Sequence, residues 1–446
     1  MTTRETLACL REYESRNVTF IEADGSWPIV WQRASGVHVW DAEGRKYLDL
    51  TAAFGVAAAG HANPRVVRAG QAQMARLLHA MGDVHPHALK ARLARELSRL
   101  TFERWGGATE GRKGGGKVVG GHAAGATGKA IFCNSGFEAV EAALKTALLA
   151  TGRPGVLAFE GAYHGLGYGA LNVTQRRHFR WAFRRQLREF GHFVPFPISV
   201  ASLETVEARI RDLFRRKLPG AVLVEPVQAR GGINVPPPGF LPMLRRVCNE
   251  HGALLILDEV YTGFGRTGRW FACEHSGTVP DLVCLGKALT GGFPLSACVG
   301  RAAVMDAAWP ASNGEAIHTS TFLGHPVGCA MALAEIREIG ARGLVQRSAE
   351  LGDALLGWLA ELVRATAGLR LEARGLGLLA GLEVRLPNGA SATELVLSAV
   401  KRLLGQGFIF LPEGEHANVV SFTPPLTISA KQLRSAVRAL APSLSP

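Results

Sequence analysis

Two residues that could do chemistry follow short apolar runs, at positions where buried strands would end. Asp258 comes directly after the run ALLIL, and Lys287 comes directly after LVCLG. Ligands of α/β sheets lie beyond the carboxyl ends of strands. A carboxylate there needs a partner, such as a cationic ring nitrogen, and a lysine there could be used in a Schiff base. Taken singly, a capping aspartate and a surface-loop lysine remain the alternatives.

A third feature is a possible phosphate site at the start of a helix. In AIFCNSGFEAVEAALK an apolar strand leads through a Ser-Gly turn into a helix that begins near Phe137 and Glu138. The N–H groups of a first helical turn have no partner within the helix, and the helix dipole favours an anion there. These groups could bind a phosphate, although an ordinary N-cap at Ser135 would give the same pattern.

The surrounding pattern predicts the elements that position these residues. From about residue 130, short apolar runs such as KAIFC, GVLAF and AVLVE alternate with longer amphipathic segments, which is typical of a mostly parallel α/β sheet. Residues 31–50 favour a small antiparallel meander with tight turns at Gly36 and Gly44. After residue 325, long helical patterns and a strand pattern predict a separate α+β domain. A length of 446 residues fits two or three domains.

The Gly-rich segment 106–128 ends in a sequence close to a phosphate-binding P-loop. A P-loop needs glycine at its start and Ser or Thr after its lysine, whereas Ala123 and Ala130 stand at those positions here. We therefore expect a flexible surface loop.

The formal net charge of +13 raises nucleic acid or an acidic membrane surface as partners. The basic residues run through the whole chain, however, and are densest only in residues 176–188, where arginines alternate with aromatic residues. Such a segment could grip a nucleic-acid strand. We favour a solvated segment or one that covers the active site, and expect neither nucleic acid nor membrane as a partner.

The seven cysteines are scattered and never spaced as CxxC, so neither a disulfide framework nor a zinc site is expected. The first residues, MTTRETLACLREYESR, lack the features of a signal peptide, and no apolar run is long enough for a membrane span. We expect a cytoplasmic protein.

Six ordered motifs along most of the chain resemble those of the class III (omega) aminotransferases, pyridoxal-phosphate (PLP) enzymes of the aspartate-aminotransferase fold. They are NSGFEAVE at 134–141, FEGAYHG at 159–165, EPVQ at 225–228, DEVYTGFGRTG at 258–268, Lys287 and HTSTF at 318–322. RGLG at 374–377 and PPL at 424–426 complete the resemblance.

The resemblance implies the α/β fold of PLP-dependent transferases. In this fold a large domain holds a mostly parallel seven-stranded sheet between helices, and a small α+β domain is built from both termini. We expect residues 61–325 to form the large domain, and residues 1–60 and 326–446 to form the small one.

By the same resemblance, Ser135 and the amides of Gly136 and Phe137 bind the phosphate of the cofactor. Tyr163 stacks on one face of its ring, and Val260 packs against the other. The family usually has Thr where this chain has Phe137, so we expect one side-chain contact to the phosphate to be lost.

The remaining roles concern the cofactor ring and its bond to the protein. Asp258 pairs with the ring nitrogen and keeps it protonated, so that the ring can accept electrons. Gln228 contacts the ring hydroxyl, and His164 and Glu225 also belong to the cofactor site. Lys287 carries the cofactor as an internal aldimine and later moves a proton between substrate and cofactor, for which a lowered pKa is suitable.

The resemblance also implies an obligate homodimer with shared active sites. Ser320 and Thr321 would reach the phosphate of the cofactor in a second subunit.

Other reactions remain open on the same residues. A racemase, an aminomutase, a decarboxylating transaminase or a phospho-lyase could use them, because the cofactor performs the chemistry and the pocket selects the bond that breaks. We favour transamination. A nucleic-acid-binding protein is the alternative from another class.

The substrate prediction is based on arginines that are missing. Relatives that bind dicarboxylic keto acids typically carry Arg at the positions held here by Leu166 and Ser421, and relatives that accept plain amines often use an Arg at the position of Leu411. A carboxylate in a partly dry pocket needs such a partner. We therefore expect Phe54, Leu166 and Leu411 to line an apolar site.

The expected donor is a primary amine or omega-amino compound whose carboxylate is distant or absent. As acceptor, pyruvate or an aldehyde is expected rather than 2-oxoglutarate. An arginine from elsewhere in the chain, such as Arg180, Arg184 or Arg374, could replace the missing ones.

Overall fold

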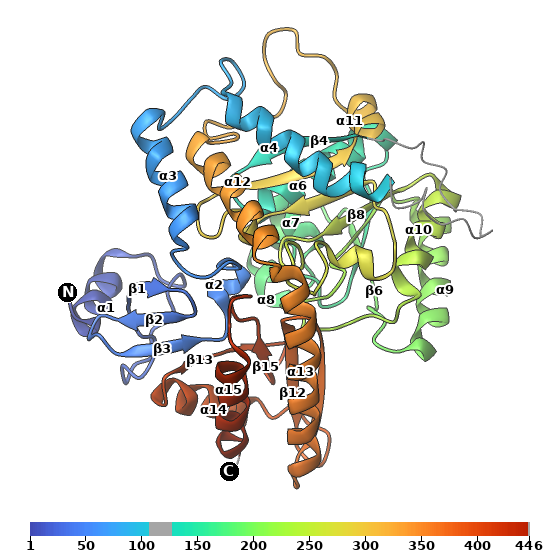
Figure 1. Ribbon diagram of the computed structural model, residues 1–446. Coiled ribbons are helices and arrows are strands. Elements are labelled where there is room, and N and C mark those ends of the chain that lie inside the picture. Colours follow the sequence, from blue (N-terminus) through green and yellow to red (C-terminus); the bar gives the residue numbers. More distant parts are fainter. Residues whose placement is uncertain (107–126, 445–446) are drawn as a thin grey trace.

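The computed structural model of the protein describes residues 1–106 and 127–444. Most of the Gly-rich segment for which we expected a surface loop lies outside these residues. In the described part, a large sheet with helices on both faces occupies one half of the molecule. Two smaller sheets lie on the other side, one close to the N-terminus and one close to the C-terminus (Figure 1).

The large sheet has seven strands in the order β4-β10-β9-β8-β7-β5-β6. Their bounds are β4 Gly128–Cys133, β5 Val156–Phe159, β6 Gly191–Val194, β7 Ala221–Val224, β8 Leu254–Asp258, β9 Leu282–Leu285 and β10 Ser296–Arg301. Neighbouring strands from β9 to β6 are parallel, whereas β10 is antiparallel to both β4 and β9. The expected mostly parallel seven-stranded sheet is confirmed.

Alternate residues of these strands face opposite layers of helices, as the two-residue period of a strand requires. Leu257 of β8 belongs to a core with α4 (Ala88–Ser98) and α10 (Phe240–His251), whereas Ile256 belongs to a second core with α6 (Gly136–Thr151). Because both faces of the sheet are covered, its strands are continuous apolar runs rather than alternating ones.

Both ends of the chain build the smaller part. β1 (Trp31–Ser35), β2 (His38–Asp41) and β3 (Lys46–Asp49) form the expected antiparallel meander, and β13 (Phe408–Ile409) joins it in parallel with β3. A second sheet has the order β11-β12-β15-β14. Its strands are β11 Arg370–Leu376, β12 Leu379–Arg385, β14 Leu411–Glu413 and β15 Val419–Phe422.

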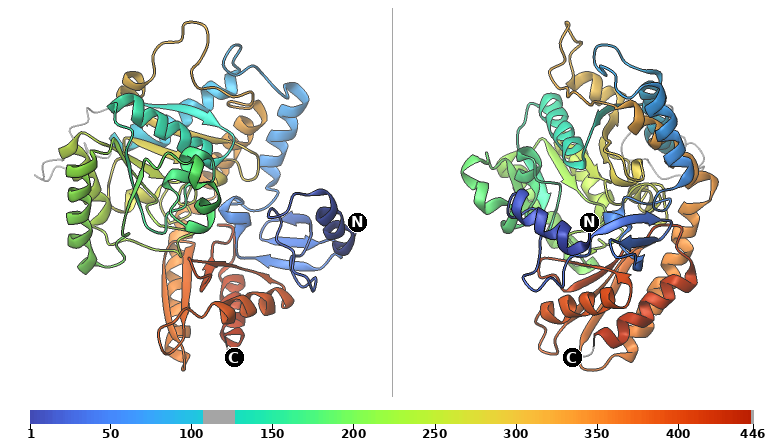
Figure 2. Two further views of the ribbon diagram at one scale, coloured as in Figure 1. Left: turned by 180° about the vertical axis from the view of Figure 1, so that it is seen from behind. Right: turned by 90° about the vertical axis from the view of Figure 1, so that its left-hand side faces the viewer.

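Figure 2 shows these N-terminal and C-terminal elements beside each other, below the large sheet. An α+β region built from both termini is therefore confirmed. The domain boundaries at residues 60 and 325 stay a prediction.

The remaining helices cover the sheets and connect them. They are α1 Thr3–Tyr13, α2 Ala52–Gly55, α3 Pro64–Arg76, α7 Tyr168–Val173, α8 Arg177–Arg180, α9 Val200–Lys217, α11 Ala302–Ala308, α12 Pro326–Ala341, α13 Leu344–Ala365, α14 Thr393–Gly405 and α15 Ala430–Ser443. Short helical turns are η1 Arg99–Glu103, η2 Trp181–Gln186, η3 Ala272–His275 and η4 Lys287–Leu289. Among the described residues, no helix combines the length and the apolar character that a membrane crossing needs.

The Arg-rich stretch at 176–188 forms α8 and η2. Arg177 and Arg184 lie over the ring of Trp181, with their Cζ atoms 4.0 and 3.9 Å from its centroid. The aromatic ring at the centre of this stretch is thus already stacked with arginines of the same segment.

Candidate active site

Three of the residues singled out in the sequence meet at one edge of the large sheet. β7, β8 and β9 are parallel neighbours, and Glu225, Asp258 and Lys287 stand at or just beyond their carboxyl ends. They border a cavity of about 360 Å³. Its lining is formed by Gly136, Phe137, Tyr163, His164, Gly165, Leu166, Glu225, Arg230, Asp258, Val260, Tyr261 and Lys287.

Asp258 is fixed by two partners beside the cavity. Its Oδ2 lies 2.8 Å from Nδ1 of His164, and its Oδ1 accepts a hydrogen bond from the Val260 N–H at 3.1 Å. Both Asp258 and His164 are buried. Nε2 of His164 is also buried and has no hydrogen-bond partner within the part of the chain that the structure describes. A carboxylate held in this way can accept a hydrogen bond from a cationic ring nitrogen.

Lys287 reaches the cavity from a strained backbone position at the start of η4. Its φ is 44°, in the left-handed region that residues other than glycine rarely adopt. Its Nζ lies 4.6 Å from the ring centroid of Tyr261. Burial lowers the pKa of the Lys287 amine, against the opposing charges of Asp258 and Glu225. A lowered pKa enlarges the fraction of neutral amine that can attack a carbonyl or take up a proton.

Glu225 holds the backbone on both sides of the cavity. Its carboxylate accepts hydrogen bonds from the Tyr163 N–H at 2.9 Å and from the Ala229 N–H at 3.2 Å. Burial raises the pKa of Glu225 to about 7, an effect that His164 opposes and Asp258 reinforces. Glu225 therefore positions the segment that carries Tyr163.

The start of α6 is packed closely against Val260. A Cβ on Gly136 would lie 2.9 Å from Cγ1 of Val260, so only glycine leaves room for this approach. The N–H groups of this first turn are suited to an anion, as the sequence predicts. The Ser135 hydroxyl, for which we expect a phosphate contact, donates to Oε2 of Glu138 at 3.1 Å.

Apolar and aromatic side chains form much of the remaining wall. Phe137, Tyr163, Leu166 and Val260 all line the cavity. The roles toward cofactor and substrate that the sequence suggests for them stay predictions. The ring of Tyr163 contacts that of Phe179 edge-on, with 5.5 Å between their centroids.

Gln228 does not border the cavity. Its Nε2 donates to the carbonyl of Glu160 at 2.7 Å, and its Oε1 accepts from Nδ2 of Asn234 at 3.0 Å. The side chain is 1% exposed. The predicted contact of Gln228 with a ring hydroxyl stays a prediction, since each amide atom keeps one further hydrogen-bonding site.

Three residues expected to line the substrate site are not among those that border the cavity. Phe54 is exposed, and Leu411 belongs to β14. Ser421 is buried in β15, and its hydroxyl donates to the Leu411 carbonyl at 3.0 Å.

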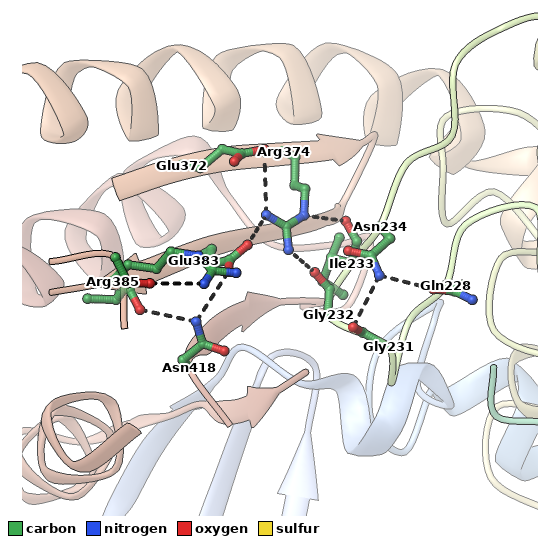
Figure 3. Close-up of polar contacts among 12 residues, drawn as sticks. Gln228, Gly231, Gly232, Ile233, Asn234, Glu372, Arg374, Glu383, Arg385 and Asn418 are labelled. Carbon is green, nitrogen blue, oxygen red and sulfur yellow. Dashed lines mark hydrogen bonds and ion pairs between the residues drawn. The ribbon is translucent and has the colours of Figure 1, made fainter. Parts of the chain in front are cut away.

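Arg374, another predicted substrate residue, uses its guanidinium within the protein (Figure 3). Nη1 donates to Glu383 at 2.7 Å, Nη2 to the Gly232 carbonyl at 2.7 Å and Nε to the Ile233 carbonyl at 3.1 Å. Arg374 thereby ties β11 to the loop that follows β7. It does not border the cavity.

Ser320 and Thr321 are exposed and do not border the cavity of their own chain. Exposed side chains of this kind could reach the active site of a second subunit. That role of Ser320 and Thr321 stays a prediction.

Sequence reasoning missed two residues that border the cavity, Tyr261 and Arg230, and the partner of Arg230, Glu413. Tyr261 follows Val260 in the DEVYTG motif, and Arg230 stands two residues after EPVQ, so their neighbouring motifs are a signal that could have found them. Glu413 ends β14, is buried and pairs with Arg230. No feature of the local sequence marks it.

Comparisons with known proteins agree with this geometry. Residues 20–444 match the family described as aminotransferase class-III. The acetylornithine aminotransferase of Methanosarcina acetivorans is 34% identical over 93% of this chain and 92% of its own length. The putrescine aminotransferase of Pectobacterium atrosepticum is 36% identical over 96% of this chain and 86% of its own.

A solved structure with the same fold is that of the ornithine aminotransferase from Toxoplasma gondii, described as having partial occupancy of PLP at its active site. Its TM-score is 0.82 at 28% identity, over 99% of this chain and 94% of that one.

Proposed function

Because this chain belongs to the class-III aminotransferases and is a PLP-dependent transaminase, we propose that it moves an amino group from a primary amine or omega-amino compound to a keto acid or aldehyde. We assign the attachment of the cofactor to Lys287. The observation that carries this assignment is the position of Lys287 Nζ in the same cavity as the paired Asp258 and His164.

The residues of the cavity fit PLP. Gly136 lets Val260 pack closely against the start of α6, where first-turn amides can hold a phosphate. Asp258 is already oriented by His164 to accept a hydrogen bond from a protonated ring nitrogen. Tyr163 and Val260 offer surfaces for a flat ring. When bound, PLP supplies an electron-accepting ring that stabilises negative charge on the substrate carbon next to the nitrogen.

The protein groups would then hold and move protons. The carboxylate of Asp258 keeps the proton on the ring nitrogen, because an adjacent negative charge favours the protonated form. With the cofactor bound, the Lys287 Nζ would be the group placed to take a proton from the substrate carbon and to deliver it to the cofactor. Burial lowers the pKa of the Lys287 amine, which favours the form that can accept a proton.

The wall of the cavity supports an amine without a nearby carboxylate as donor. Leu166, Phe137 and Tyr261 provide apolar and aromatic surface. The putrescine aminotransferase of Pectobacterium atrosepticum is named for a diamine, which has no carboxylate, and the relative from Methanosarcina acetivorans is named for acetylornithine. Donors with a distal amine fit both the lining and these names.

We further propose a cytoplasmic homodimer with shared sites. Ser320 and Thr321 are exposed and available to a neighbouring subunit. Exposed apolar side chains near them in the sequence, Ile317 and Phe322, would be covered in such a dimer. All seven cysteines are free thiols, which fits a reducing compartment.

A substrate panel tests the proposed donor and acceptor. We expect putrescine and other primary amines to be faster donors than glutamate, and pyruvate or an aldehyde to be a faster acceptor than 2-oxoglutarate. The rates are measured under identical conditions with the cofactor-loaded protein. If glutamate and 2-oxoglutarate are the fastest pair, the substrate proposal is wrong.

A further inference from the structure

We infer that Arg230 binds the carboxylate of a substrate in the cavity. When such a substrate binds, its carboxylate takes the place of Glu413 as the partner of Arg230. This inference rests on the proposed function, since it supplies the carboxylate contact for a keto-acid acceptor or an omega-amino acid donor. Arg230 would supply a cation to the cavity, although the three positions where relatives carry arginine hold Leu166, Leu411 and Ser421 here.

Arg230 is close to the reacting groups. It borders the same cavity as Lys287, and its Cζ lies 5.5 Å from the ring centroid of Tyr163. The charges of Arg230 and Glu413 both act on the Lys287 amine, in opposite directions. A carboxylate held by Arg230 would therefore lie in the compartment where the amine reacts.

The backbone of Arg230 is firmly held. Its carbonyl accepts hydrogen bonds from the guanidinium of Arg176 and from the Gly414 N–H. On the other side of the loop, Arg374 binds the carbonyls of Gly232 and Ile233 (Figure 3). Figure 3 also shows that Asn234 is bonded to Gln228, which closes the base of the loop. A fixed backbone lowers the entropic cost of using the side chain to bind a ligand.

The guanidinium of Arg230, in contrast, is underused. A guanidinium carries five N–H donors, yet the ion pair with Glu413 spans 3.6 Å from Nε to Oε2, which is longer than a hydrogen bond. Nε is buried and has no hydrogen-bond partner among residues 1–106 and 127–444. The side chain is 33% exposed. A substrate carboxylate could form the two parallel hydrogen bonds that Glu413 does not form.

The local charges favour an additional anion. The carboxylate of Glu413 interacts with two guanidinium groups, those of Arg230 and Arg176. It is 3% exposed, whereas the Arg230 side chain remains partly accessible. Glu413 can thus neutralise Arg230 while a substrate without a carboxylate is bound, and can leave it to a substrate that brings one.

The test compares matched substrates with and without a carboxylate. For the acceptor we pair pyruvate with propanal, and for the donor 5-aminovalerate with pentylamine. In Arg230→Gln we expect the ratio of kcat/KM within at least one pair to shift about tenfold to hundredfold against the carboxylate substrate, the range for losing charge-assisted hydrogen bonds. The pair that shifts identifies the source of the carboxylate. If both ratios change by less than tenfold, the inference is wrong.

Three further variants separate binding from structure. Arg230→Lys keeps the positive charge but not the planar guanidinium that can bind both carboxylate oxygens. It should therefore restore only part of the wild-type preference for the carboxylate substrate. Glu413→Gln removes the competing carboxylate and should lower the KM of the carboxylate substrate, whereas a purely structural Glu413 would not change it in that direction. Arg211→Gln is the matched control, since Arg211 is 32% exposed, pairs with Glu207 and Glu250 and lies outside the cavity.

A binding measurement distinguishes failure of this inference from failure of the proposed function. Propanoate has no carbonyl or amine to react, so its affinity for the cofactor-loaded protein can be measured by calorimetry without turnover. We expect Arg230→Gln to weaken it tenfold or more. Unchanged propanoate affinity in a protein that transaminates amines would overturn the inference alone. Weakened affinity in a protein that does not transaminate amines would overturn the proposed function alone.

Discussion

The carboxylate of Asp258 illustrates how one residue type acquires different roles in this chain. Asp258 lies at the carboxyl end of β8 and contacts His164 and Val260, with one side turned to the cavity. Asp281 is equally buried at the opposite end of the neighbouring strand, where it pairs with Arg245 and Arg301. The first is available to a ligand, whereas the second is saturated by the protein.

Asp258→Asn should leave the protein folded and reduce turnover roughly a thousandfold, because the neutral amide no longer keeps the ring nitrogen protonated. Turnover is measured with saturating PLP, and folding by circular dichroism. Asp281→Asn is the matched control. It breaks a buried ion pair and should lower the melting temperature while turnover per folded molecule is retained. A near-normal rate in Asp258→Asn would mean that Asp258 only orients its neighbours.

At the scale of elements, α12 carries a buried carboxyl group that must affect stability. Oε1 of Glu335 accepts a hydrogen bond from the Ala59 N–H at 2.9 Å, and its Oε2 is buried without a hydrogen-bond partner in the described residues. Burial raises the pKa of Glu335 to about 8, and the charge of Glu338 adds to this effect. The side chain is therefore neutral in the folded protein at neutral pH.

The folded protein should bind one more proton than the unfolded chain between about pH 4.5 and pH 8. Stability from this group is complete below that window and is lost as pH rises through it, by on the order of 5 kcal/mol at most. Glu335→Gln cannot ionise, so its stability relative to the wild type should increase from pH 5 to pH 8.5 in chemical denaturation. If the difference in unfolding free energy between Glu335→Gln and the wild type is the same at pH 5 and at pH 8.5, Glu335 does not titrate in this range.

The sequence was sufficient to predict the strand-end residues. Asp258 and Lys287 follow apolar runs, and the carboxyl ends of parallel strands meet at one edge of a sheet. The pairing of Arg230 with Glu413 could not be predicted in this way. It depends on how β14 packs against the loop after β7, a contact between distant segments that no local pattern encodes. The sequence offers Arg374 as one arginine that could replace the missing ones, but its three acceptors become visible only once β11 is placed beside that loop.

At the scale of the whole molecule, segments from both ends of the chain lie together beside the large sheet. β13 near the C-terminus pairs with β3 near the N-terminus, and β14 brings Glu413 to Arg230. Segment 318–322, which matches the family in sequence, contributes nothing to the lining of its own cavity. A family motif that does not border the cavity of its own chain fits a shared site in a dimer.

Mixing two inactive variants tests this arrangement. Lys287→Ala lacks the lysine but keeps Ser320 and Thr321, whereas the double variant Ser320→Ala with Thr321→Val keeps the lysine but binds the phosphate of its partner weakly. Each mixed dimer would contain one complete site and one site that lacks both the lysine and the Ser320 and Thr321 side chains. Because random subunit exchange makes half of the dimers mixed, about a quarter of all sites should be active. Activity is measured at limiting PLP, where the double variant alone should be impaired. If the mixture is no more active than the sum of the two variants, Ser320 and Thr321 do not serve a second subunit.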